Sequence, residues 1–279
     1  MFSIKRLAAA AISVLTVASL AACGSANAAS ESESGTDKNG TITVNVGTMG
    51  TYSPYSIKNT DGSYTGYDLE VLKAVEKVEP SLKFEFHAGS WDSLFTSLDA
   101  NKNQMIANEI GKTKEREQKY IFTKNSYNYS TRHIIVKKGT KGINTLDDLK
   151  GKVVGGTVGD NHTKFLEEWN NAHGNPITIK YYEEDFTTVV RDVASGRIAA
   201  TINDPNAALD KAKKQNIPVE AVGEPLSAQP VYYIFRNDDQ GKKIRDKIDE
   251  GLDKLKKNGE LSKLSIEWFG QDTTEETAK

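Results

Sequence analysis

The residue types that most often carry enzyme chemistry form no recognisable motif in this sequence. It has no Gly-x-Ser-x-Gly nucleophile motif and no Walker loop, and the glycines of residues 155–159 lack the spacing of a dinucleotide-binding loop. The histidines are dispersed without metal-ligand spacing, so we expect surface or hinge positions for His87, His133, His162 and His173. These patterns predict a protein that is not an enzyme and that uses no metal ion or cofactor.

Two charged residues stand where a small polar ligand could bind. Asp204 follows a strand pattern at residues 199–202 and precedes Pro205, so it is a strong helix N-cap at the edge of an open sheet, where ligands tend to bind. Arg116 lies in the charged run 112–119, which favours exposure, although a guanidinium can also donate two parallel hydrogen bonds to a carboxylate. The residues themselves leave both alternatives open, cap or ligand acid for Asp204 and surface charge or carboxylate clamp for Arg116.

The first 23 residues have the composition of an export signal. Lys5 and Arg6 precede the apolar residues 7–22, a run too short and too weakly apolar to span a bilayer comfortably. Residues 20–23, Leu-Ala-Ala-Cys, resemble the lipobox of bacterial lipoproteins, which implies a lipid thioether on Cys23 as the mature N-terminus. Cys23 is the only cysteine, so a disulfide within the protein is excluded. An ordinary signal peptide with a coincidental cysteine is the alternative.

The rest of the chain has the composition of a soluble globular protein, and the export signal places it outside the cytoplasm. After the signal peptide, residues 1–22, residues 23–40 are rich in Ser, Ala, Glu and Gly and predict a flexible tether that begins at the lipidated Cys23. The whole chain is 37% hydrophobic and 27% charged, with a net charge of −2, which gives no electrostatic footprint for nucleic acid. We therefore expect an extracytoplasmic protein that its lipid holds on the cell membrane.

From Thr41 onward, short β-branched segments alternate with amphipathic helical patterns. This alternation favours mostly parallel sheets covered by helices, an α/β fold. The strand patterns lie at residues 42–46, 82–87, 133–137, 153–155, 177–181, 199–202 and 231–236. The clearest helical patterns lie at residues 68–78, 91–100, 186–193 and 244–255, and Thr145 with Asp148 resembles a capping box.

Glycine and proline positions favour two lobes over one large sandwich. Residues 139–142 follow a strand pattern, and residues 145–151 then start a fresh series of strands and helices. Late in the chain, residues 224–230 lead into the strand 231–236 and two terminal helices. The chain can therefore cross into a second lobe and return.

Seven short motifs resemble the polar amino-acid-binding proteins of ABC importers, the family-3 extracellular solute-binding proteins. Each is weak alone, but they stand in the family's order, and the match covers residues 41–272. They lie at residues 47–48 with 52–55, 66–68, 91–94, 113–116, 195–198, 261–264 and 268–270.

The resemblance implies a two-lobed periplasmic-binding-protein-like fold with two hinge strands and the ligand in the interlobe cleft. The lobes are expected to close around the ligand by a hinge motion. Lobe one would comprise residues 41–132 and 232–272, lobe two residues 137–229, and the hinges residues 133–136 and 231–234. This division agrees with the glycine and proline positions.

The resemblance also implies roles for residues of the cleft. The family's carboxylate-binding arginine lies in a Thr-x-x-Arg segment, which here places it at Arg116. Asp204 matches the acid that binds the ligand's ammonium group. Tyr52 and Trp91 match aromatic positions that wall the side-chain pocket, although Trp91 also fits the core stripe of its own helix.

Two positions depart from the family's pattern. Residues 159–161 are Gly-Asp-Asn where relatives usually carry Gly-Thr-Thr or Gly-Thr-Asn at a helix start that meets the ligand carboxylate. Asp160 should repel a carboxylate there unless it turns away to cap the helix, whereas the Asn161 amide region is expected to contact ligand. Gly111 stands where relatives often have Ser or Thr, and it can offer only its backbone amide.

Extra negative charge favours a ligand with a second cationic group. Asn108 and Glu109 match a cleft-facing segment, and Glu109 and Asp160 would add charge beside Asp204. Cystine is favoured, and Lys, Arg or His would also fit. The segments most like the cystine-binding branch are residues 106–108, 159–161 and 203–204.

The predicted protein is a monomer that hands an amino acid to the membrane permease of an ABC importer and binds no nucleic acid. One alternative is an exported dehydratase-like enzyme on the same fold, which would need a general base in the cleft. A sensor module is another alternative, but it would usually continue into a transmembrane and signalling domain, whereas this sequence stops at Lys279.

Overall fold

The computed structural model describes residues 40–183 and 186–276, all within one compact unit. The predicted signal peptide, the predicted lipidation site Cys23 and all but the last residue of the predicted tether lie outside the described residues. In the described part, no helix combines the length and the apolar character that crossing a membrane requires.

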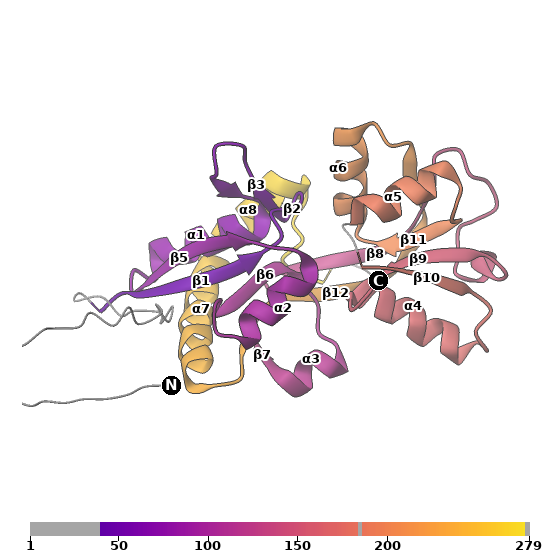
Figure 1. Cartoon of the computed structure of the whole chain (residues 1–279). Helices are drawn as coiled ribbons and strands as arrows, with labels where there is room; N and C mark the ends of the chain where they lie inside the picture. The colour runs from indigo at the N-terminus through magenta and orange to yellow at the C-terminus, as the bar shows by residue number, and fades with distance from the viewer. Residues whose placement is uncertain (1–39, 184–185, 277–279) are drawn as a thin grey trace, which may run out of the picture. The chain divides into compact units, whose positions relative to one another are not determined.

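The strands form two parallel groups joined into one continuous ladder, in the order β10-β9-β11-β8-β12-β6-β1-β5, with β7 also paired to β12. Lobe one holds β1 (Ile42–Thr48), β5 (Leu82–Ala88), β6 (Met105–Ile110) and β7 (Tyr120–Phe122), and lobe two holds β9 (Val153–Thr157), β10 (Thr178–Tyr182) and β11 (Ala200–Asn203). β8 (Asn128–Lys137) and β12 (Val219–Arg236) pair antiparallel with each other and connect the two groups. The predicted α/β, two-lobed fold is therefore confirmed (Figure 1).

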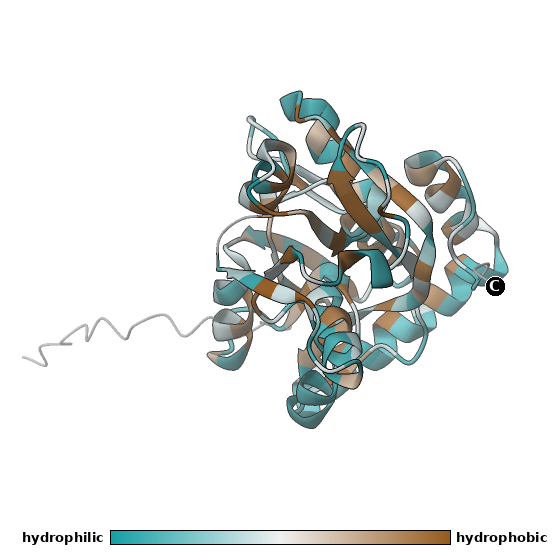
Figure 2. Cartoon of the chain, turned by 90° about the vertical axis from the view of Figure 1, so that its right-hand side faces the viewer, coloured by the Kyte–Doolittle hydropathy of each residue, from teal (hydrophilic) through white to brown (hydrophobic). Residues whose placement is uncertain are grey.

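Helices cover the sheet of each lobe. Lobe one carries α1 (Tyr67–Val78), α2 (Trp91–Asp99), α3 (Lys114–Lys119), α7 (Asp239–Lys257) and α8 (Glu260–Phe269), with a small sheet of β2 (Thr51–Tyr52), β3 (Ser56–Lys58) and β4 (Tyr64–Thr65). Lobe two carries α4 (Asn161–Ala172), α5 (Phe186–Ser195) and α6 (Pro205–Gln215). Figure 2 shows hydrophobic residues gathered on the inner strands and hydrophilic residues along the outer helices.

The predicted elements form for the reasons that their sequences indicate. In α1, Leu69, Leu72 and Val75 lie on one stripe and are fully buried, and the helix ends just before Pro80. Asp204 accepts hydrogen bonds from the first backbone amides of α6, as an acidic N-cap followed by Pro205 should.

Two local predictions differ from the structure. Asp148 accepts hydrogen bonds from the amide and hydroxyl of Thr145, but the segment forms only a 3₁₀ turn, Asp147–Leu149. Gly151, with φ of 74°, reverses the chain before a longer helix can grow. Strand β6 has no counterpart among the predicted strands, because all six of its residues are buried and the polar Asn108 and Glu109 interrupt any apolar run.

The strands β8 and β12 connect the two lobes, and in β8 the connecting residues precede the predicted hinge. Residues 133–136 of β8 pair with β11, and residues 232–236 of β12 pair with β6 or β7, so these segments belong to the sheets of the lobes. Between them, residues 128–132 pair with residues 227–231. The predicted hinge at 231–234 touches this crossing at its first residue, and the predicted hinge at 133–136 lies beyond it.

Candidate functional site

A small cavity lies between the two lobes. Its volume is about 40 Å³, room for only about three water molecules at roughly 10–15 Å³ each. An amino acid can therefore enter only when the lobes part or their side chains shift. Lobe one lines the cavity with Met49, Tyr52, Trp91, Asn108 and Glu109, and lobe two lines it with Thr157, Asp160, Asn161, His162, Phe186 and Asn203.

Direct contacts hold the lobes together around this cavity. The Tyr52 hydroxyl on lobe one donates to Asn203 Oδ1 on lobe two at 3.1 Å. On the outer side, Lys164 Nζ of α4 lies 3.1 Å from Glu115 Oε1 of α3. The structure therefore represents a closed arrangement of the lobes.

Glu109 has an unusual backbone at the edge of the cavity. Its φ is 50°, a left-handed conformation that non-glycine residues seldom adopt and that is common at functional sites. The buried Asp68 stabilises it, because Asp68 Oδ2 accepts a hydrogen bond from the Glu109 amide at 2.6 Å. The Glu109 carboxylate is thereby directed between the lobes.

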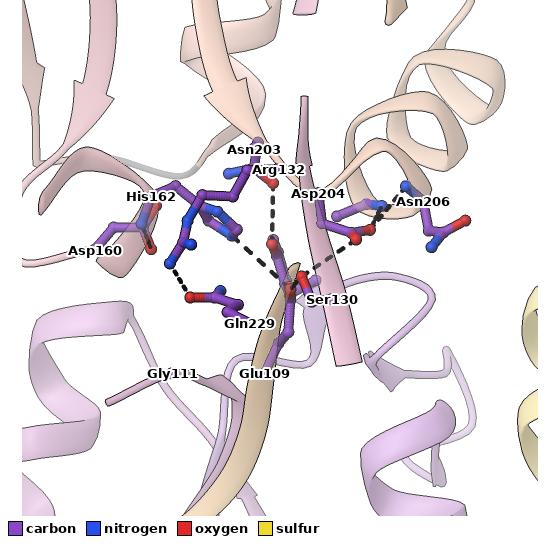
Figure 3. Close-up of polar contacts among 12 residues, drawn as sticks. Glu109, Gly111, Ser130, Arg132, Asp160, His162, Asn203, Asp204, Asn206 and Gln229 are labelled. Carbon is purple, nitrogen blue, oxygen red and sulfur yellow. Dashed lines mark hydrogen bonds and ion pairs between the residues drawn. The ribbon is translucent and has the colours of Figure 1, made fainter. Parts of the chain in front are cut away.

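Glu109 and Asp204 share a single hydroxyl group (Figure 3). Ser130 Oγ lies 2.5 Å from Glu109 Oε1 and 3.3 Å from Asp204 Oδ2. Burial raises the pKa of Asp204 to about 6, and burial followed by repulsion from Asp204 raises the pKa of Glu109 well above its usual value. A cation placed between the two carboxylates would relieve this repulsion.

Asp160 both caps a helix and faces the cavity. Its Oδ1 accepts a hydrogen bond from the His162 amide at the start of α4, at 3.3 Å. Burial raises its pKa to about 6, and the guanidinium of Arg116 opposes that rise. Burial, followed by the charges of Arg132 and Arg116, holds the pKa of His162 well below its usual value, so His162 is neutral at pH 7.

Arg116 is buried, so the exposed alternative is wrong. Its Nη1 donates to the Gly111 carbonyl and its Nη2 to the Gly159 carbonyl of lobe two, each at 2.8 Å. The guanidinium carbon lies 5.3 Å from the ring centroids of both Trp91 and Phe95. Burial lowers the pKa of Arg116 to about 10, which leaves it charged at neutral pH.

The structure brings most of the predicted site residues together. Six of them line the cavity. The other three contact lining residues: Arg116 lies against Trp91, Asp204 shares the Ser130 hydroxyl with Glu109, and Gly111 lies against Asn161. Asn108 supports the wall, because its Oδ1 accepts a hydrogen bond from the Met49 amide at 2.9 Å. The six are Tyr52, Trp91, Asn108, Glu109, Asp160 and Asn161.

Sequence reasoning missed the polar residues on the crossing strands. Along β8, Asn128, Ser130 and Arg132 are buried at every second position. This alternation of polar side chains was a usable signal, but on a strand it is normally typical of a solvent-facing side. Among the described residues, no group of three or more His, Cys, Asp and Glu side chains is arranged to hold a metal ion.

The chain matches the family described as bacterial extracellular solute-binding proteins, family 3, over residues 44–271. It belongs to this family. The extracytoplasmic location and the solute-binding class predicted from the sequence are thereby confirmed, and the family is defined by binding rather than by catalysis.

Individual relatives and solved structures show which members of the family this chain is similar to. The L-cystine-binding protein TcyJ of Bacillus subtilis (strain 168) is 37% identical over 230 residues, covering 82% of this chain and 85% of that protein. The L-cystine-binding protein TcyJ of Escherichia coli (strain K12) is 37% identical over 238 residues, covering 83% of this chain and 84% of that protein. A structure from work on glutathione import via GshT and the cystine ABC importer TcyBC of Streptococcus mutans has a TM-score of 0.74 at 30% identity, covering 83% of this chain and 96% of the other.

A basic-amino-acid binder is also similar. The structure of an ancestral arginine-binding protein bound to arginine has a TM-score of 0.72 at 29% identity, covering 82% of this chain and 98% of the other. Both branches therefore share the architecture seen in Figure 1.

Proposed function

We propose that this protein is the substrate-binding lipoprotein of an ABC importer for polar amino acids, with L-cystine as the favoured ligand. The names of the relatives TcyJ from two bacteria support cystine. The observation that carries the proposal is the charge content of the closed cleft. Three buried acids, Glu109, Asp160 and Asp204, lie with two buried arginines, Arg116 and Arg132, a set that matches a ligand with both ammonium and carboxylate groups.

In this proposal, one carboxylate and one ammonium group of the ligand each have a partner of opposite charge. Arg116 binds a ligand carboxylate, and Glu109 with Asp204 binds an ammonium group at the Ser130 hydroxyl. Tyr52 and Trp91 pack against the ligand's side chain. Bending takes place where β8 and β12 cross between the lobes, at residues 128–132 and 227–231.

A thermal-shift screen tests the ligand directly. Protein beginning at Gly24 is unfolded and refolded to remove carried-over ligand, then screened against the common amino acids, cystine and glutathione. At about 1,000 times its Kd, a ligand stabilises the folded state by about 4 kcal/mol, which raises the melting temperature by several degrees. A response to cystine supports the proposal, whereas a response confined to Lys, Arg or His assigns the basic-amino-acid alternative. Formation of a product from bound ligand would assign the dehydratase-like alternative.

The membrane anchor is a separate part of the proposal, since Cys23 lies outside the described residues. A thioether-linked diacylglyceryl group on Cys23 would keep the exported protein in the membrane fraction. The Cys23→Ala variant is expected to lose radiolabelled fatty acid and to move to the soluble exported fraction. If the parent protein appears in the soluble exported fraction as fast as Cys23→Ala does, the anchor is contradicted. The proposal for ligand binding is not affected by that result.

A further inference from the structure

Glu109 stands at an irregularity in the pairing of β6. Three residues of β6, 107–109, stand opposite a single residue of β12, Tyr233. Such a bulge interrupts the ladder of hydrogen bonds, and bulges beside functional sites re-aim a side chain. Here the bulge holds Glu109 at its left-handed φ of 50°, and the carboxylate meets the Ser130 hydroxyl that Asp204 also faces (Figure 3).

A buried side chain supplies the acceptor for the Glu109 amide. Asp68, the second residue of α1, is fully buried, and its Oδ2 accepts a hydrogen bond from that amide at 2.6 Å. A buried amide is costly without an acceptor, and a carboxylate is a strong one. Both residues belong to lobe one, so this contact does not require the lobes to close.

Buried tyrosines hold the Asp68 end of this contact. The Tyr233 hydroxyl donates to the Asp68 carbonyl at 2.6 Å, and the Tyr67 hydroxyl donates to the Tyr127 carbonyl at 2.8 Å. The rings of Tyr127 and Tyr233 stack with their centroids 4.2 Å apart. Because Tyr233 also stands opposite the bulge, the start of α1 and both sides of the bulge form one packed unit around the Glu109 backbone.

The charge of Asp68 does not explain its presence beside Glu109. Burial raises the pKa of Asp68 to about 7, and the hydrogen bond from the Glu109 amide opposes that rise. A negative charge on Asp68 repels the Glu109 carboxylate and contributes to its raised pKa. The other titratable side chains that face Asp68 are tyrosines, each with a pKa that burial raises well above 10: Tyr55, Tyr67, Tyr127 and Tyr233. What Asp68 offers Glu109 is therefore the hydrogen bond to its amide.

We propose that Asp68 is a positioning residue for the ammonium site, which acts by holding the Glu109 backbone in its left-handed conformation. This inference rests on the proposed function, in which Glu109 and Asp204 bind an ammonium group. In the described part of the chain, Asp68 is not one of the residues that line the cavity, so its effect on the ligand passes through Glu109. The carboxylate is then ordered before the ligand arrives, which spares the ligand the cost of ordering it.

The test compares two substitutions of Asp68 that branch at the same carbon atom. Asp68→Asn loses the charge and keeps an oxygen that can accept the Glu109 amide, whereas Asp68→Leu loses the acceptor as well. Calorimetry measures L-cystine binding to the protein beginning at Gly24. Asp68→Leu should bind at least about tenfold more weakly than the parent, the scale of ordering one residue on binding. Asp68→Asn should stay within about threefold of the parent, because the hydrogen bond remains.

A second measurement needs no ligand. Hydrogen exchange at the Glu109 amide should be at least about tenfold faster in Asp68→Leu than in the parent, because the amide loses its buried acceptor. Asp68→Asn should exchange at nearly the parental rate. Unchanged exchange in Asp68→Leu would show that the Glu109 backbone is held without Asp68, and would overturn the inference.

Asp249→Leu is the matched control. Asp249 is a buried acid on α7 of the same lobe, and its Oδ1 likewise accepts backbone amides, those of Lys124 and Asn125 at 2.8 and 3.3 Å. Its loss should lower the melting temperature and leave the affinity for cystine at the parental value. Equal losses of affinity in Asp249→Leu and Asp68→Leu would show a general effect of removing a buried acid, and would overturn the positioning role.

The remaining outcomes separate this inference from the proposed function. Parental affinity in Asp68→Leu overturns the inference and leaves the proposed function intact, whereas no binding of cystine by the parent removes both. Equal losses of affinity in Asp68→Asn and Asp68→Leu assign the effect to the charge and overturn positioning by the hydrogen bond. If Asp68→Leu does not fold, Asp68→Ala serves instead, since its smaller side chain also lacks the acceptor. Parental affinity in Asp68→Ala then overturns the inference.

Discussion

Asp204→Asn is expected to weaken ligand binding by about 30-fold or more without loosening α6. Asparagine caps helices about as well as aspartate, so its side-chain oxygen can keep the bonds from the Asn206 and Ala207 amides, now 2.8 and 3.1 Å long. The substitution removes the charge and puts an amide donor in place of the Oδ2 atom that faces the Ser130 hydroxyl. Truncating one partner of a buried charge pair costs about 2–5 kcal/mol, which corresponds to a loss of roughly 30- to 5,000-fold in affinity.

The pH dependence of Asp204→Asn separates the two roles of the carboxylate. The pKa of Asp204 in the folded protein is raised from 3.8 to about 6. Its protonated form therefore stabilises the fold below pH 4, and that contribution is lost as the pH rises through 6. Thermal unfolding should show the variant gaining stability relative to the parent between pH 4 and 7.

Affinity should follow the opposite trend in the parent. An ammonium group binds the ionised carboxylate, so parent affinity should fall as the pH drops below about 6. In Asp204→Asn that fall should be smaller, because one of the two acids that bind the ammonium group no longer titrates. Calorimetry at pH 5 and pH 7.5 measures both proteins. Equal affinities for parent and variant at both values would leave Asp204 as a helix cap only.

The fold could be predicted largely from apolar periodicity, and the exceptions have physical causes. Strand β6 is buried on both faces yet carries Asn108 and Glu109, because these residues face the interlobe cavity rather than water. A sequence pattern reports burial, and it does not distinguish an apolar core from a polar cleft. For a similar reason, the pattern of β8 does not reveal that β11 pairs with its residues 133–136, so the hinge predicted there stays a prediction.

The prediction of the candidate site depended on the family resemblance more than on the types and spacing of the residues taken by themselves. The charged run 112–119 by itself favoured an exposed Arg116, and only the motif Thr-x-x-Arg pointed to a role in the cleft; the structure shows Arg116 buried. Ser130, Arg132 and Gln229 belong to no quoted motif, so neither approach found them. Their burial depends on the tertiary structure, because it arises where β8 and β12, two strands far apart in the sequence, pair as they cross between the lobes.

Arg116→Ala should lower ligand affinity by at least about 30-fold, or about 2 kcal/mol, since it removes both a carboxylate partner and a contact between the lobes. The variant leaves the Gly111 and Gly159 carbonyls without their buried donor and uncovers the rings of Trp91 and Phe95. Arg116→Lys keeps a charge but cannot donate from two nitrogens to two carbonyls, so it should recover only part of the affinity.

A control variant separates the contribution of Arg116 to ligand binding from its contribution to closure of the lobes. Lys164→Ala breaks an ion pair with Glu115 that also joins the lobes, at 3.1 Å, but both side chains are partly exposed. An exposed pair of this kind contributes about 0–1 kcal/mol, so we expect at most about a fivefold change in affinity. Calorimetry gives the affinities, and small-angle scattering with and without ligand reports closure. Arg116→Ala with parental affinity would remove Arg116 from the site, whereas lost affinity with normal closure at saturating ligand would assign it to the carboxylate alone.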